Sequence, residues 1–160
     1  MHIRTATLQD LHQITSIEQK CFPAAEAADE HAFAQRIKAF SSSFYVLEKD
    51  GEIIGFINGS ITNHTTIVDE MYENATLHDP NGKYQAVFGL DVLPEYQKQG
   101  FARALMQHLI AQSKQQNRKG VILTCKKRLI PFYEKFGFVC KGRSASVHGN
   151  AVWYDMQLDF

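Results

Sequence analysis

Residues 90–103 read LDVLPEYQKQGFAR, and this stretch decides the fold. An apolar strand ends here, a short polar loop follows, and a long helix begins near Gly100. A helix N-terminus carries free N–H groups and the positive end of the helix dipole, which together favour a bound phosphate. Gly100 lets a ligand approach the backbone closely, while Lys98 and Arg103 add positive charge. The stretch therefore predicts a strand–loop–helix unit with an anion site at its turn.

The segments on either side alternate between strand and helix patterns. Asp50-Gly51 lies between two apolar runs and is typical of a tight hairpin. Thr7, followed by Asp10, has the spacing of a capping box at a helix start. The expected strands are 2–6, 44–48, 53–61, 86–93, 121–124, 139–144 and 151–158, and the expected helices start at residue 7 and span 29–40, 101–117 and 129–135.

This order predicts an α/β (α+β) fold. The strand–helix–strand unit over 86–124 requires parallel pairing, and the hairpins require antiparallel pairing elsewhere. We therefore expect a mixed central sheet of about seven strands with helices on both faces. No linker or repeat interrupts the 160 residues, so residues 1–160 are expected to form one domain.

Composition excludes several classes of protein. Seventeen basic residues balance seventeen acidic ones, so neither nucleic acid nor an anionic membrane is an expected partner. The first residues are polar, and no apolar run approaches the ~20 residues of a membrane span. Cys21, Cys125 and Cys140 form no CxxC pair, which disfavours a disulfide framework or a zinc site. We expect a cytoplasmic protein without a metal.

Two motifs carry a family resemblance. The pattern Gln97-x-x-Gly100-x-Ala102 also occurs in ordinary strand-to-helix connections, but here it resembles the Q/R-x-x-G-x-G/A signature of the GNAT N-acetyltransferase superfamily. Residues 131–138, PFYEKFGF, look like that superfamily's second motif, and the element order is similar as well. The resemblance implies a GNAT-like fold and direct transfer of acetyl from acetyl-CoA to a primary amine.

Further segments are similar to the arylalkylamine (serotonin) N-acetyltransferases within this superfamily. They are residues 75–82 (ATLHDPNG), residues 129–138 and the Cys21-Phe22-Pro23 segment. The resemblance implies a small amine as the acceptor. By the same resemblance, acetyl-CoA is held through the backbone of Leu90, Asp91 and Val92, and by Lys98, Gln99, Gly100, Phe101, Ala102 and Arg103.

Tyr133 is the catalytic residue that the resemblance implies. The superfamily often uses a tyrosine here as the general acid that protonates the departing CoA thiolate. A phenol with a pKa of about 10 can donate to a thiolate whose conjugate acid has a pKa near 8.5. We expect a backbone N–H near Val92, freed by a bulge in the strand, to polarise the thioester carbonyl.

The general base is not defined by the sequence. The arylalkylamine enzymes carry a His-x-His pair before the cofactor loop, and those positions are Ala86 and Phe88 here. The lone histidines His64 and His148 receive no role. The candidate proton acceptors are Asp91, Glu26, Glu70 and His78, acting directly or through water.

Residues 21–31, with part of 62–74, are expected to form a mobile lid over the amine. Glu26, Asp29 and Glu30 would give this lid a negative charge that attracts an ammonium group. Other acceptors stay open: a protein N-terminus, a lysine or an aminoglycoside-like amine. A non-catalytic acetyl-CoA sensor is a further alternative, and an exposed final strand would permit a homodimer.

Overall fold

The computed structural model describes residues 1–160 and contains nine strands and five α-helices. The strands are β1 His2–Thr5, β2 Phe44–Lys49, β3 Glu52–Asn58, β4 Ile61–Thr62, β5 Tyr84–Val87, β6 Gly89–Val92, β7 Gly120–Cys125, β8 Val139–Arg143 and β9 Tyr154–Asp159. The helices are α1 Leu11–Cys21, α2 Glu30–Phe40, α3 Glu70–Glu73, α4 Phe101–Gln115 and α5 Ile130–Glu134.

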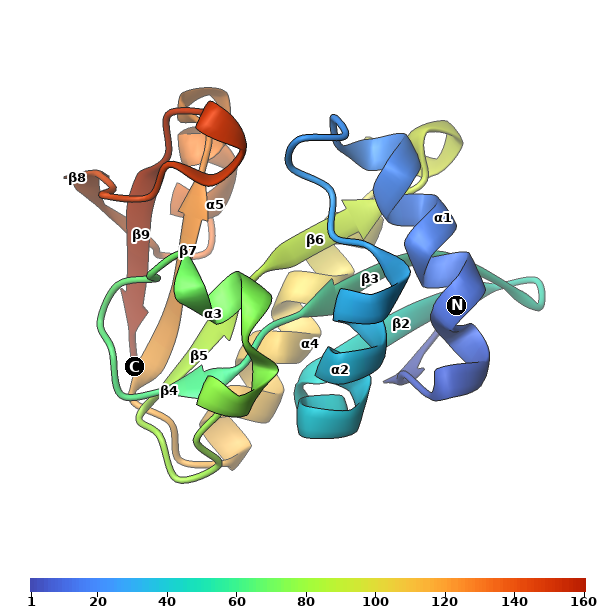
Figure 1. Cartoon of the computed structure of the whole chain (residues 1–160), viewed down its shortest axis with the longest axis horizontal. Helices are drawn as coiled ribbons and strands as arrows, with labels where there is room; N and C mark the ends of the chain where they lie inside the picture. The colour runs from blue at the N-terminus through green and yellow to red at the C-terminus, as the bar shows by residue number, and fades with distance from the viewer.

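The strands form two sheets that diverge from each other (Figure 1). One has the order β1-β2-β3-β6, and the other has the order β4-β5-β7-β9-β8. The mixed α/β fold is as predicted. The expected count of strands differs because the predicted strand over 86–93 is interrupted at Phe88, and because β4 adds a short pairing partner for β5.

The interruption at Phe88 moves the chain from one sheet to the other. The amides of Phe88 and Leu93 both donate to β3, at 2.7 Å to Asn58 O and 2.8 Å to Ile54 O. These residues are an odd number of positions apart, so a regular strand could not point both amides the same way. Before the break, β5 runs parallel to β7 as far as the pair Val87–Leu123. Beyond it, β6 pairs with β3 alone, and an opening separates β6 from β7.

Both faces of the first sheet are covered, and this explains why residues 44–47 of β2 are apolar and buried at four successive positions. In β2, Phe44 and Val46 pack beneath α1 and α2, whereas Tyr45 and Leu47 face the core on the α4 side. Figure 1 shows α1 and α2 in front of this sheet and α4 behind it. The alternation of period two therefore distributes side chains between two cores.

Local sequence signals account for several element boundaries. Asp50 and Gly51 both have positive φ, 53° and 81°, as a tight turn between β2 and β3 requires. The carboxylate of Asp29 accepts a hydrogen bond from Ala32 N–H at 2.8 Å and caps α2. The carboxylate of Asp10 accepts a hydrogen bond from Thr7 N–H at 2.8 Å, as the capping-box spacing predicts.

The expected role of the final strand is wrong. β9 lies between β7 and β8 and is hydrogen bonded on both sides, so it has no free edge for a second copy of the chain. Hydrogen bonds to both neighbours occupy its backbone groups, and the edge position belongs to β8. No helix combines the length and apolar character that crossing a membrane requires.

Candidate active site

The loop between β6 and α4 forms a small hollow of about 160 Å³, which we call the loop hollow. Lys98 and Gly100 adopt positive φ, 61° and 90°, and so turn the chain sharply into the helix. A Cβ built at Gly100 would meet no heavy atom within 4 Å, so the space above this residue is open. The hollow is lined by Val92, Tyr96, Gln97, Lys98, Gly100, Ala102, Arg103 and Phe132.

Unpaired amides face this loop. The carbonyl of Gly100 is the first acceptor used by α4, and it receives the N–H of Ala104 at 3.0 Å. The amides of the preceding helical residues, 101–103, have no acceptor within the helix. Together with the ammonium of Lys98 and the guanidinium of Arg103, they fit a pyrophosphate. These residues would hold the diphosphate of acetyl-CoA.

Not all of the residues predicted to bind the cofactor face the loop hollow. Gln99 turns back and donates its side-chain amide to Glu95 O at 3.1 Å. Phe101 packs edge-on against Tyr96, with ring centroids 6.1 Å apart. Asp91 points to the face of the sheet that α1 covers, where it is 1% exposed. Its side chain therefore does not face the cofactor.

The open edge of β6 presents backbone amides to the gap between the sheets. Because Leu93 donates to β3, the alternate amides of Leu90 and Val92 point to the opposite edge. The expected bulge near Val92 lies instead at Phe88, and this earlier break is what frees both amides. Gln97 donates its side-chain amide to Val92 O at 3.0 Å and ties the cofactor loop to the strand.

A central cavity of about 470 Å³ adjoins the opening between β6 and β7. Its walls come from α1, α2, α3, β5, β6, β7, α5 and the two loops 22–29 and 144–153. The aromatic side chains that line it are Phe22, Tyr72, Phe88, Tyr133 and Trp153. Carboxylates line it as well, namely Glu18, Glu26, Asp29 and Glu73. Three basic side chains, Arg36, Lys126 and Arg128, line it too. The apolar lining suits a compact ligand with an apolar body, and the carboxylates can receive a cationic group on it.

Tyr133 lies in the wall of this cavity, as its predicted role requires. Its ring packs edge-on against Phe132 and Phe138, with centroids 5.1 and 5.8 Å away. Burial raises the pKa of Tyr133, and the neighbouring Cys125 and Asp91 raise it further. The phenol is therefore protonated at neutral pH, which is the form that a general acid needs.

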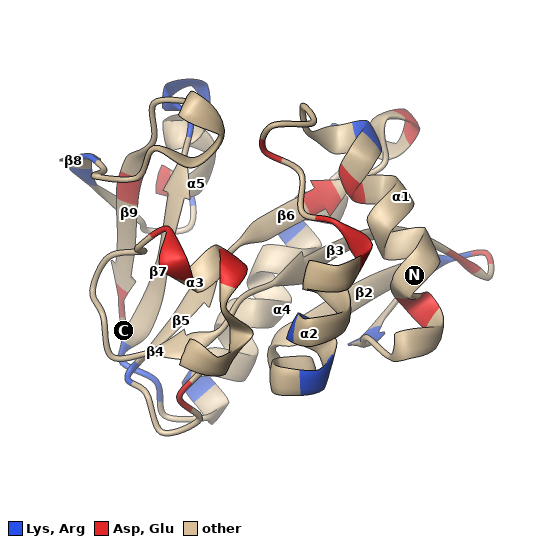
Figure 2. Ribbon diagram, in the orientation of Figure 1, with Lys and Arg blue, Asp and Glu red and all other residues tan.

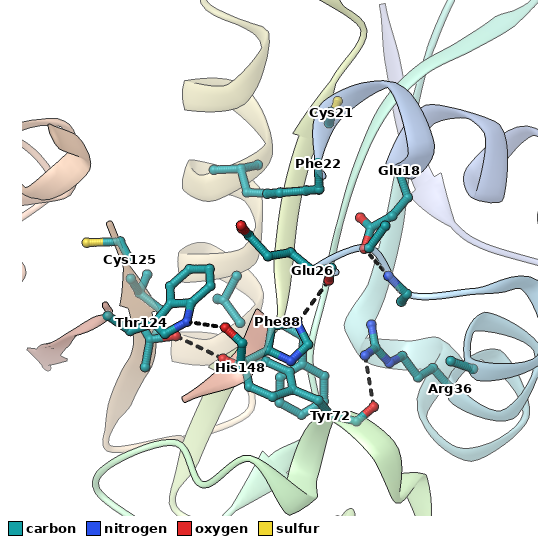
Figure 3. A pocket seen from close by; sticks show the side chains of 18 of the residues that line it. Glu18, Cys21, Phe22, Glu26, Arg36, Tyr72, Phe88, Thr124, Cys125 and His148 are labelled. Atoms are coloured by element: carbon teal, nitrogen blue, oxygen red, sulfur yellow. Dashed lines mark hydrogen bonds between the residues drawn. The ribbon is translucent and has the colours of Figure 1, made fainter. Parts of the chain in front are cut away.

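The loops 22–29 and 144–153, which both line the cavity, are bound to each other (Figure 3). The ring Nε2 of His148 lies 2.9 Å from Glu26 O, and the ammonium of Lys126 lies 2.9 Å from a carboxylate oxygen of Glu26. The indole of Trp153 donates to His148 O at 2.8 Å. The ring of Tyr72 lies beside that of His148, with centroids 4.8 Å apart. We call this set of contacts the loop bridge.

The predicted lid is brought together only in part. Residues from 21–31 and two from 62–74, Tyr72 and Glu73, line the cavity, but Glu30 does not. The charge of Glu26 is paired with Lys126, and the carboxylate of Asp29 caps α2. The segment 144–153, which no sequence signal had placed here, supplies the other half of the cover.

The four candidate bases are separated by the fold. Glu26 reaches the cavity, but as half of an ion pair. Glu70 is exposed on α3, and His78 accepts the amide of Ile61 at 2.9 Å beside Phe40, so neither lines the cavity. Asp91 lies directly behind the cavity wall.

Sequence reasoning missed Glu18 and Arg36, which form a buried polar group with Asn58 and Asp91. Glu18 and Arg36 each lie on a helix among apolar residues: Glu18 is one turn after Ile14, and Arg36 is next to Ile37. A charged residue on an otherwise apolar helix face is the signal that was available. The guanidinium of Arg36 donates to Asn58 Oδ1 at 3.1 Å and to Tyr72 O at 3.0 Å.

Charge differs between the two sides of the opening. Figure 2 shows acidic segments on the 22–29 loop and on α3, and basic segments in the turn that precedes α5. The basic residues are Lys126, Lys127 and Arg128. An ammonium group is therefore favoured on the side of α1 to α3, and an anionic ligand on the side of α5.

Comparison with known proteins agrees with this geometry. The sequence profile described as the acetyltransferase (GNAT) family matches residues 11–138. Serotonin N-acetyltransferase of Mesocricetus auratus is 27% identical over 159 residues, covering 96% of this chain and 75% of that protein. An N-alpha-acetyltransferase of Sulfurisphaera tokodaii is 29% identical over 140 residues, covering 85% and 78% of the two chains.

Among solved structures, the GphF GNAT-like decarboxylase in complex with isobutyryl-CoA superimposes with a TM-score of 0.87. It is 19% identical and the match covers 99% of both chains. At this identity the likeness concerns the fold alone.

Proposed function

Because the chain belongs to the GNAT acetyltransferase family, we propose that it transfers acetyl from acetyl-CoA to the primary amine of a small molecule with an apolar or aromatic body. The protein is an acetyl-CoA-dependent N-acetyltransferase. What we propose is the chemical class of the acceptor, a small amine.

The loop bridge is the observation that carries this proposal. It joins the loops 22–29 and 144–153 over the central cavity through Glu26, Lys126 and His148. A peptide bound by its N-terminus must leave the site as an extended chain, and the joined loops would obstruct such a chain. A small amine can be enclosed completely, and the aromatic lining favours an apolar or aromatic body.

The reaction needs three groups besides the amine site. The loop hollow around Gly100 would hold the diphosphate of acetyl-CoA and align the thioester along the open edge of β6. The amides of Leu90 and Val92 would hydrogen bond to the thioester end and stabilise the oxyanion that forms on attack. Tyr133 would donate its phenolic proton to the CoA sulfur as the C–S bond breaks.

A protein N-terminus is the second candidate acceptor, since one relative is an N-alpha-acetyltransferase. It would require the loop bridge to open. The two candidate acceptors therefore predict different effects of weakening the loop bridge. If the acceptor is a small amine, its turnover should fall; if the acceptor is a protein N-terminus, turnover of the peptide should rise.

Release of free thiol from acetyl-CoA tests the proposal. The panel contains tyramine, tryptamine, spermidine and a short peptide with a free N-terminus. We expect turnover with an aromatic amine and little with the peptide. Lys126→Met, which removes the ion pair to Glu26, should raise KM for the amine, whereas the exposed neighbour Lys127, changed to Met, should have no effect. Preference of the wild type for the peptide would refute a small-molecule acceptor.

A further inference from the structure

Two carboxyl groups from distant parts of the chain meet beneath the central cavity. Glu18 comes from the last turns of α1, and Asp91 comes from β6. They are 6% and 1% exposed, and their side chains are within hydrogen-bonding reach of each other. Only Glu18 lines the cavity, while Asp91 lies behind it. Figure 3 shows Glu18 at the cavity wall, above Arg36.

The absence of a side chain at Gly89 opens the pair to the cavity. A Cβ built on Gly89 would lie 3.1 Å from an oxygen of Asp91 and 3.8 Å from Oε1 of Glu18. Gly89 itself lines the cavity. Any larger residue would therefore come between the carboxyl pair and a ligand.

Several polar atoms of this group have no partner in the protein. Oε2 of Glu18 accepts the amide of Ala28 at 2.9 Å, but its buried Oε1 is unpaired. Both carboxyl oxygens of Asp91 are likewise buried and accept no hydrogen bond from an N–H group, and the donors Nε of Arg36 and Nδ2 of Asn58 are buried without an acceptor. Unsatisfied buried polar atoms are costly, and where they border a cavity they indicate a ligand that supplies the missing hydrogen bonds.

Charge in this group balances if the two carboxyls share one proton. Arg36 contributes one positive charge, and a pair with one proton contributes one negative charge. Burial raises the pKa of Asp91 well above its usual range, and the neighbouring carboxylate of Glu18 raises it further. A protonated Asp91 can donate a hydrogen bond to the neighbouring Glu18 carboxylate and so hold that side chain from behind. The ionisable groups that face the pair are Cys21 of α1, Arg36 of α2 and Tyr133 of α5. Arg36 in turn faces Asp29, the N-cap of α2, and Tyr72 of α3.

We propose that Glu18 is the catalytic residue that binds the acceptor's ammonium group and takes its proton, and that Asp91 is the positioning residue that holds Glu18 from behind. This inference rests on the proposed function of a small-amine acetyltransferase. It assigns the proton acceptor that Ala86 and Phe88 cannot supply. Of the other candidates, Glu70, His78 and Asp91 do not line the cavity, and Glu26 is paired with Lys126.

The proton balance of the reaction follows from this assignment. The ammonium R–NH₃⁺ gives one proton to Oε1 of Glu18, and the lone pair thus freed attacks the thioester carbon. The C–N bond forms and the C–S bond then breaks, with its electron pair leaving on sulfur. The thiolate takes a proton from Tyr133, which recovers one from the amide nitrogen as that nitrogen loses its second proton. Glu18 releases the first proton to solvent, so each turnover liberates one proton.

The first test is the rate of thiol release with the preferred amine of the panel, between about pH 5 and about pH 9. Glu18→Gln keeps the size of the side chain and an oxygen that can accept the Ala28 amide. We expect it to lower kcat/KM for the amine about 10²–10⁴-fold while acetyl-CoA affinity stays within about threefold. The exposed Glu52, changed to Gln, should behave as the wild type.

The same assay separates the two carboxyls. Asp91→Asn should reduce kcat less than Glu18→Gln does and should shift the acidic limb of the pH profile. Gly89→Ala leaves both carboxyls in place but blocks access to them, so it should raise KM for the amine without changing acetyl-CoA affinity. This variant keeps the test valid if Glu18→Gln fails to fold. Near-wild-type kcat/KM in either Glu18→Gln or Gly89→Ala would overturn the inference.

A second readout does not depend on turnover. A carboxyl whose pKa is raised by folding stabilises the protein below its unfolded pKa of about 4, and this stabilisation is lost as the pH rises through its folded pKa. Urea unfolding should therefore show stability that falls with pH in the wild type and a flatter dependence in Asp91→Asn. Identical slopes would refute the buried pair. If the wild type releases no thiol with any amine of the panel, that result would instead refute the proposed function, and this inference with it.

Discussion

Replacing Gly100 by alanine tests the placement of acetyl-CoA without disturbing the packing of the protein. Gly100 has φ 90° and ψ 3°, and a Cβ there would meet no protein atom within 4 Å. The added methyl group therefore clashes with nothing in the free protein. It would project into the open space beside the unpaired amides at the start of α4, where we place the diphosphate.

The substitution has two separable consequences. An L-residue in the left-handed region costs roughly 1–2 kcal/mol, so Gly100→Ala should lower the free energy of unfolding by about that amount. For a chain of this size, each kcal/mol corresponds to a Tm change of about 2–4 °C. In addition, the methyl group should hold the diphosphate away from the amides and weaken acetyl-CoA binding at least tenfold, or about 1.4 kcal/mol.

Gly51→Ala is the matched control. Gly51 has φ 81°, nothing lies within 4 Å of its Cβ position, and it belongs to the turn between β2 and β3 rather than to the loop hollow. Calorimetric titration with acetyl-CoA, together with thermal unfolding, measures both consequences. Both variants should lose stability, but only Gly100→Ala should lose affinity. Equal acetyl-CoA affinities in the two variants would refute the placement of the diphosphate.

Three further predictions concern other parts of the molecule. Tyr133→Phe should lower kcat about 10²–10⁴-fold with acetyl-CoA affinity nearly unchanged, as thiol-release kinetics and calorimetry would show; a near-normal kcat would exclude Tyr133 as the acid. Leu105→Ala, at a fully buried position between α4 and the sheet, should cost about 2–5 kcal/mol of unfolding free energy in urea, and a loss below this range would mean that the core collapses around the gap. The hydrogen bond from Arg4 holds the pKa of Asp10 below its usual range, so the stability it provides is present above an unfolded pKa of about 4 and is lost as the pH falls through the folded pKa. Asp10→Asn should therefore be less stable than the wild type at neutral pH and approach it in acid, and a gap independent of pH would contradict this coupling.

The sequence by itself predicted the elements that depend on short-range effects. The turn at Asp50-Gly51 follows from the steric tolerance of those two residues for positive φ. The strand–loop–helix unit over 90–103 follows from an apolar run, a glycine and a helical period, all within a few residues of one another. The phosphate loop was predicted for the same reason, since its amides, Lys98 and Arg103 are neighbours in the chain.

Only the tertiary structure decided which residues surround the central cavity. The break at Phe88 arises because the chain passes from the sheet that contains β5 to the sheet that contains β6. No local sequence pattern distinguishes this break from a continuous apolar strand. The loop bridge joins Glu26 to His148, and the carboxyl pair joins Glu18 to Asp91. Each pair is distant in the chain, so its members approach only when the helices and sheets pack. Burial, which raises the pKa of Asp91, is likewise a property of the packed core and not of the residue.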